Sequence, residues 1–148
     1  MKAFVVHAPG QSTIEEVESP VAKPGHVVID IARAGVCGTD VEFFNGDMAY
    51  FQTGEAKYPM RLGHEWCGTV SSAGEGVDKN WIGKRVTGDT MLGCQECKRC
   101  KSGLQHVCSK RFEIGIRNGW PGALAEQLLV PEFSLYELPD SVDDTVGA

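Results

Sequence analysis

The chain has 148 residues, 42% of them hydrophobic, and a formal net charge of -6 at pH 7. A chain of this length buries about two thirds of its unfolded surface, so the composition supports one folded domain and argues against disorder. The negative charge disfavours proteins that bind nucleic acid or membrane surfaces, because those partners require a basic face. No apolar run has the length of a membrane span or a signal peptide, so we expect a cytoplasmic protein.

Short apolar runs separated by glycine and proline predict a mainly β fold. The clearest run is at residues 26–34, where Val27, Ile29 and Ile31 alternate with residues of the opposite face. Several short strands at this spacing are typical of a barrel or a sandwich. We expect strands at residues 2–8, 13–18, 26–34, 66–73, 84–87, 123–131 and 134–138.

The sequence predicts one short helix, at residues 39–45. Thr39 is the expected N-cap, and Asp40 lies in the electropositive first turn. Gly46 is the expected stop.

The segment at residues 92–111 is rich in Cys, Lys, Arg and Gly and has no helical or strand periodicity. Cys94, Cys97, Cys100 and Cys108 have the spacing C-x2-C-x2-C-x7-C, which allows one loop to surround one ion. Tetrahedral zinc suits four thiolates best, and a filled shell makes the site structural. Two disulfides or an iron-sulfur cluster are the alternatives.

Zinc bound by four thiolates carries an excess charge of about -2. Five basic side chains of the same segment are expected to offset that charge and to lower the thiol pKa values. They are Lys98, Arg99, Lys101, Lys110 and Arg111.

Two motifs upstream of these cysteines carry a further cysteine and a histidine, GVCGTD at residues 35–40 and GHE at residues 63–65. One thiolate and one imidazole alone are a weak sign of a metal site. The order of motifs is more specific, because GKRV at residues 83–86, the four-cysteine segment and ALAE at residues 123–126 follow. Together they resemble the zinc-dependent alcohol dehydrogenases of the medium-chain dehydrogenase/reductase family, in their GroES-like catalytic domain.

The resemblance runs through nearly the whole chain and implies a fold for it. Residues 1–148 would form a GroES-like domain, a partly open β-barrel with short helices. A zinc-binding loop lobe would occupy about residues 92–111.

The resemblance also implies a second, catalytic zinc. Cys37 and His64 would bind this ion, with one position left open for the substrate, and Glu65 would either be a further ligand or lie just behind the ion. Asp40 would accept a hydrogen bond from His64 and fix its tautomer. Thr39 would place its hydroxyl against the alcohol and remove its proton.

Glu42 departs from the family pattern, since many relatives carry a histidine at the corresponding place. Glu42 passes the proton on, water does so, or the residue only solvates the helix. Cys67 matches no ligand position and is expected to be a buried thiol.

The implied reaction oxidises an alcohol to a carbonyl by hydride transfer to NAD or NADP. The substrate would be a secondary alcohol, polyol, sugar or amino alcohol, because Glu65 after the histidine and Thr39 after Gly38 favour that branch of the family. The full-length enzyme is expected to be a homo-oligomer. The alternative is a non-catalytic GroES-like zinc-binding module that serves protein interaction.

A dinucleotide-binding unit would show G-x-G-x-x-G between a strand and a helix, and no glycine run in this sequence matches it. In relatives a Rossmann cofactor domain follows the catalytic domain. We therefore expect that domain after residue 148, and we expect this chain alone to be inactive.

Overall fold

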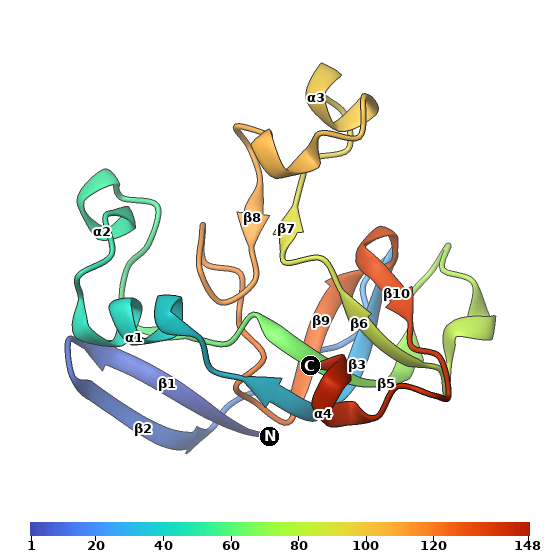
Figure 1. The fold of residues 1–148 in the computed structure, drawn as a ribbon, viewed down its shortest axis with the longest axis horizontal. Coiled ribbons are helices and arrows are strands. Elements are labelled where there is room, and N and C mark those ends of the chain that lie inside the picture. The colour runs from blue at the N-terminus through green and yellow to red at the C-terminus, as the bar shows by residue number, and fades with distance from the viewer.

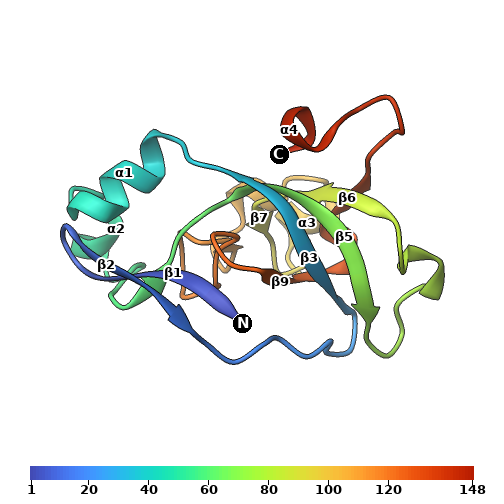
Figure 2. The same cartoon turned by 90° about the horizontal axis from the view of Figure 1, so that it is seen from below.

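The computed structural model describes all 148 residues, and ten strands make up most of its regular structure (Figure 1). Five strands form an antiparallel sheet: β3 (His26–Gly35), β5 (Glu65–Ala73), β6 (Arg85–Gly88), β9 (Gln127–Pro131) and β10 (Leu135–Glu137). Their order in the sheet is β10-β6-β5-β3-β9. Figure 2 shows β3 and β5 running side by side through the molecule.

A second antiparallel sheet contains β1 (Lys2–Ala8), β2 (Gln11–Glu16) and β4 (Met60–Arg61), in the order β2-β1-β4. The backbone just before β9 connects the two sheets. The Phe4 N–H donates to the Leu124 carbonyl at 2.8 Å, and the Glu126 N–H donates to the Lys2 carbonyl at 3.1 Å. The predicted strand at 123–131 is thus divided into a bridging half and β9.

The main core lies against the five-stranded sheet. Trp66 is its largest side chain and is 1% exposed. Gly68 allows β5 to approach β3, because a Cβ atom there would lie 2.2 Å from the Asp30 carbonyl oxygen. The twelve buried members are Val27, Ile29, Trp66, Val70, Val77, Val86, Leu92, Ile114, Ala123, Leu128, Val130 and Leu135.

A smaller core joins α1 (Gly38–Asn45) to the N-terminal sheet through Val6, Phe43, Ala56 and Leu62. These four side chains are buried, and they fix the helix against the segment that leads into β5. The position of α1 matters because its first residues carry the predicted site.

The predicted helix is confirmed, and so is its stop at Gly46, which adopts φ 85° in the left-handed region. The prediction of Thr39 as N-cap is wrong, because Cys37 caps the helix. The Cys37 sulfur and the Asp40 carboxylate form a reciprocal capping box, so the helix begins at Gly38.

The other helices are single turns. They are α2 (Tyr50–Thr53), α3 (Lys98–Lys101), α4 (Asp144–Gly147), η1 (Lys79–Trp81), η2 (Gln105–Val107) and η3 (Glu132–Ser134). No helix is both long and apolar enough to cross a bilayer.

The four-cysteine segment forms a separate lobe. It stands on a two-stranded ribbon of β7 (Met91–Leu92) and β8 (Phe112–Glu113), and Figure 1 shows it projecting from the sheets with α3 at its tip. The mainly β fold with short helices and a cysteine lobe is therefore confirmed.

Candidate metal centres

Strand register brings the first two predicted ligands together. Cys37 follows β3 and His64 precedes β5, and the last pair between these antiparallel strands is Gly35 with Glu65. Residues just beyond that pair must lie side by side, although 27 positions separate them along the chain. The Cys37 Sγ atom is 3.0 Å from the His64 Nε2 atom.

The start of α1 shapes the Cys37 thiol. Its sulfur accepts from the Thr39 N–H at 3.3 Å, and the Cys37 N–H donates to Asp40 Oδ2 at 3.0 Å. Burial raises the pKa of the thiol, but the Asp40 and Thr39 N–H groups and the nearby imidazole outweigh it, so the net pKa is lowered. The helix start therefore favours the thiolate, which is the form that binds metals.

Asp40 lies behind the imidazole and is only 3% exposed. Its Oδ1 accepts from the Gly63 N–H at 3.0 Å and lies 3.5 Å from His64 Nδ1. Burial raises the Asp40 pKa, but hydrogen bonds from His64 and the Cys37 N–H lower it overall. The carboxylate in turn raises the pKa of His64, against the opposing effect of burial.

This arrangement fits a metal ion. The Nδ1 atom of His64 is buried, and the Asp40 carboxylate lies 3.5 Å from it. The carboxylate favours a proton on Nδ1, which leaves the Nε2 lone pair directed at Cys37. Candidate ligand atoms of Cys37, Asp40 and His64 all lie within 4.8 Å of one another. Tetrahedral zinc ligation by thiolate and imidazole needs an S···N separation of about 3.5 Å, so a small outward shift would admit the ion.

The remaining predicted site residues lie nearby but are not part of this group. Glu65 is exposed at the start of β5, and its carboxylate lies over Gly35, 2.6 Å from where a Cβ atom would stand. Thr39 is half-buried in the first turn of α1, and Glu42 is exposed one turn later. The roles predicted for these three residues stay predictions.

Two residues, Thr90 and Gly63, hold the His64 backbone. The Thr90 hydroxyl donates to the His64 carbonyl at 2.9 Å. Gly63 adopts φ 96°, and a Cβ atom there would lie 2.6 Å from the Leu124 nitrogen. Gly63 stands in the GHE motif and was visible there, whereas nothing in the sequence marks Thr90.

The lobe brings its four cysteines into one cluster. Sγ separations are 4.0 Å for Cys94 and Cys100, 3.6 Å for Cys97 and Cys100, and 3.8 Å for Cys97 and Cys108. A disulfide needs about 2.05 Å, so all four thiols are free. Ligands at about 2.3 Å around tetrahedral zinc stand about 3.8 Å apart, and the cluster fits that shape.

A backbone donor and burial are the largest causes of the pKa shifts of Cys108 and Cys100 in the lobe. The Cys94 N–H, with the Lys110 N–H, lowers the pKa of Cys108 to about 6, against the effect of burial. Burial and the Cys97 thiol raise that of Cys100 to about 12. Arg111 pairs its Nε with Glu113 at 2.6 Å and donates from Nη1 to the Cys108 carbonyl at 3.3 Å, and its effect on the sulfur charge stays a prediction.

Gly93 is a further residue that the sequence analysis missed. A Cβ atom at this position would lie 2.8 Å from the Cys100 sulfur and 2.7 Å from the Gln105 Cβ. Only glycine leaves room there for the thiol cluster.

Comparison with known proteins gives one family. The family described as "Alcohol dehydrogenase GroES-like domain" matches residues 23–140. L-threonine 3-dehydrogenase of Rhizobium rhizogenes strain K84 is 34% identical over 149 residues, which cover 100% of this chain and 42% of that protein. The chain therefore spans less than half the length of such relatives.

Solved structures of two dehydrogenases superpose on nearly the whole of this chain. A short chain alcohol dehydrogenase from Escherichia coli CFT073, in complex with NADH, superposes with a TM-score of 0.89 at 31% identity, over 99% of this chain and 41% of that one. Galactitol-1-phosphate dehydrogenase from Escherichia coli gives a TM-score of 0.84 at 30% identity, over 99% and 40%.

Proposed function

The chain belongs to the alcohol dehydrogenase GroES-like domain family, and on that premise we propose that it is the zinc-bearing catalytic domain of an NAD(P)-dependent oxidoreductase. The observation that carries the proposal is the Cys37 and His64 pair, 3.0 Å apart and backed by a buried carboxylate. A zinc ion held by Cys37 and His64 would have coordination positions left for a substrate, whereas the four cysteines of the lobe would fill the shell of one ion.

Each residue of the proposed site has one task. Cys37 and His64 would hold the ion, and Asp40 would keep the His64 proton on Nδ1 so that Nε2 stays a ligand. Zinc there would supply a Lewis acid that lowers the pKa of an alcohol hydroxyl, and a nicotinamide would supply the hydride acceptor. Glu65 would act as a third ligand after its carboxylate turns away from Gly35.

Thr39 and Glu42 would move the substrate proton. Residues three apart on a helix share a face, so the Thr39 hydroxyl and the exposed Glu42 carboxylate would form a path from the site to solvent. Thr39 would accept the hydroxyl proton, and Glu42 would receive it next.

The proposed substrate is a secondary alcohol, polyol, sugar or amino alcohol. Two relatives support this class, since one acts as an L-threonine 3-dehydrogenase and the other as a galactitol-1-phosphate dehydrogenase. The choice between NAD and NADP, and assembly as a homo-oligomer, stay parts of the proposal.

Replacement of zinc by Co²⁺ tests the proposal, because the visible spectrum of Co²⁺ reports its ligands. We expect L-threonine, galactitol or 2-propanol to change the spectrum saturably in the wild type and in Cys97→Ser, but not in Cys37→Ser. Alcohol-dependent formation of NADH or NADPH is then measured with the full-length protein. A spectrum that no alcohol changes, with no cofactor reduction, would favour the interaction module instead.

A further inference from the structure

The structure contains one arginine, Arg61, whose guanidinium donates to no acceptor. Of six arginines, five direct the guanidinium to a carboxylate or a carbonyl. Arg61 is absent from all eight ion pairs, and only its backbone takes part in hydrogen bonds. A guanidinium carries five N–H donors, so leaving a half-buried one without an acceptor is costly.

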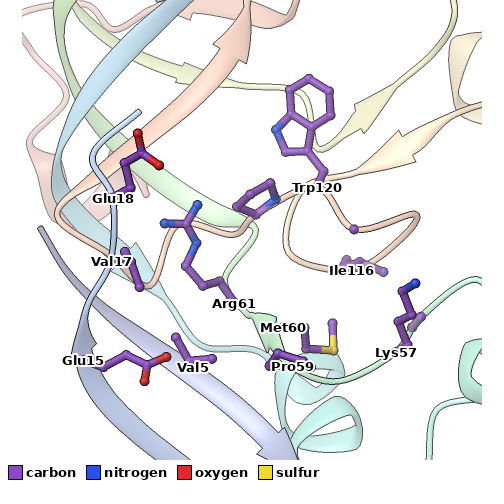
Figure 3. A pocket seen from close by; sticks show the side chains of 13 residues that line it. Val5, Glu15, Val17, Glu18, Lys57, Pro59, Met60, Arg61, Ile116 and Trp120 are labelled. Atoms are coloured by element: carbon purple, nitrogen blue, oxygen red, sulfur yellow. The ribbon is translucent and has the colours of Figure 1, made fainter. Parts of the chain in front are cut away.

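Arg61 lies where two cavities meet. These cavities have volumes of about 400 and 440 Å³, and they share Arg61, Glu18, Trp120, Gly119 and Pro121. Figure 3 shows the guanidinium in the middle of the first cavity, between Glu18 and Trp120. Neither cavity includes a residue of the two cysteine sites.

Hydrogen bonds, strand pairing and ring stacking hold the residues around Arg61 in place. The Arg61 carbonyl accepts from the Gly122 N–H at 3.1 Å, and Arg61, in β4, pairs with Val5 of β1. The Trp120 indole N–H donates to the Leu129 carbonyl at 3.0 Å, and its ring stacks on His26 with centroids 6.0 Å apart. A cavity with fixed walls binds a ligand without first paying to order them.

The walls indicate the body of the ligand. Apolar side chains line the first cavity, and Trp120 adds an aromatic surface. The apolar and aromatic lining residues are Val5, Val17, Ala56, Pro59, Met60, Ile116, Trp120 and Pro121.

The charges indicate its head group. A carboxylate is planar and fits the guanidinium fork with two parallel hydrogen bonds. Glu15 and Glu18 also line the cavity, and Lys57 is the one other basic residue there, so the lining carries no surplus of positive charge. A doubly charged phosphate is therefore disfavoured against a monoanion.

We propose that the first cavity, which surrounds Arg61, is a binding site for a small monocarboxylate with an apolar body. The carboxylate pairs with Arg61, and the body lies against Trp120, Met60 and Ile116. Burial lowers the pKa of the Arg61 guanidinium, but the group stays charged. A bound anion would offset the cost of burying that charge. The free acid and the C-terminus of a peptide share this chemistry.

The test follows the indole N–H resonance of Trp120 by NMR, assigned with Trp120→Phe. The probes are 3-phenylpropanoate, 3-phenylpropanamide, inorganic phosphate, and a short peptide that ends in phenylalanine with a free or an amidated C-terminus. We expect a saturable shift with 3-phenylpropanoate and binding at least tenfold weaker for its amide. A matching shift with the free but not the amidated peptide would identify a peptide C-terminus as a source.

Variants locate the effect. Arg61→Gln is expected to weaken binding of 3-phenylpropanoate at least tenfold, and Arg61→Lys to weaken it less, since it keeps the charge but loses the fork. The matched control is the exposed Arg33→Gln, which should bind as the wild type does. The proposal is overturned if the wild type binds acid and amide equally, binds phosphate as tightly as the acid, or shows no saturable shift. These three outcomes use the wild-type protein, so they stand even if a variant fails to fold.

Discussion

The Cys37 sulfur lies 3.0 Å from the His64 imidazole nitrogen because both residues stand just beyond the last pair of two antiparallel strands. Cys37 also caps α1, so the start of this helix fixes the thiol in position and lowers its pKa against the effect of burial. Ligand placement is therefore a consequence of strand register and helix capping.

Asp40→Asn is expected to lower zinc affinity at the Cys37 site by about 10- to 100-fold, the usual cost of losing a partner behind a metal-bound histidine. The amide keeps only one acceptor for the Cys37 and Gly63 N–H groups. Zinc affinity is measured by competition with a chromogenic chelator. Asp47→Asn, exposed just after the same helix, is the control, and the lobe zinc should be unchanged in both variants.

Gly93→Ala is expected to expel zinc from the lobe, because the added Cβ would overlap the Cys100 sulfur and Gln105. Zinc retained after dialysis against a weak chelator measures the effect. Lys101→Ala, exposed in α3, is a change to alanine in the same lobe that adds no atom to the cluster, and it should keep its zinc. Equal retention in the two variants would show that the cluster tolerates the side chain.

Glu113→Gln is expected to reduce the free energy of unfolding by about 3 kcal/mol, because it breaks a buried ion pair. Glu113 is 4% exposed, and its carboxylate lies 2.6 Å from Arg111 and 3.9 Å from Arg117. The control is Glu137→Gln, whose pair with Lys84 has the same 2.6 Å separation but is exposed. Urea unfolding should show little change in the control, so a similar loss in both would contradict the importance of burial.

Cys67→Ser is expected to flatten the loss of stability at alkaline pH. Cys67 is 0% exposed and donates to the Asp144 carbonyl at 3.1 Å. Burial, with the Asp144 charge, raises the pKa of this thiol, so its contribution is complete below the ordinary thiol pKa and is lost as pH rises through the higher folded value. Serine keeps the donor but does not titrate, and unfolding midpoints from pH 7 to about 10 compare the two proteins.

Much of the fold follows from the sequence because its longer strands carry a repeating pattern. The predicted runs at 2–8 and 26–34 correspond to β1 and β3 within one residue. The two-residue strands β4, β7 and β8 could not be predicted, since a ladder of two residues has no periodicity. Their positions follow from tertiary contacts alone.

The site was predictable in its ligands and less so in its supports. The four lobe cysteines carry recognisable spacing, whereas Cys37 and His64 were identified through the family resemblance, and the structure brings each set together. The cap was assigned to Thr39 because hydroxyls are preferred over sulfur at that position, whereas tertiary structure uses the thiol. Nothing local to Thr90, Gly93 or Arg61 reveals that they contact distant segments.

Zinc stoichiometry tests the central claim most directly. Purified protein is dialysed against metal-free buffer, and zinc per chain is measured by mass spectrometry for the wild type, Cys37→Ser and Cys97→Ser. The account predicts about two zinc ions in the wild type and about one in each variant, in line with one ion at each cysteine site. A Cys37→Ser protein that still carries two ions, or a wild type that carries only the lobe zinc, would contradict it.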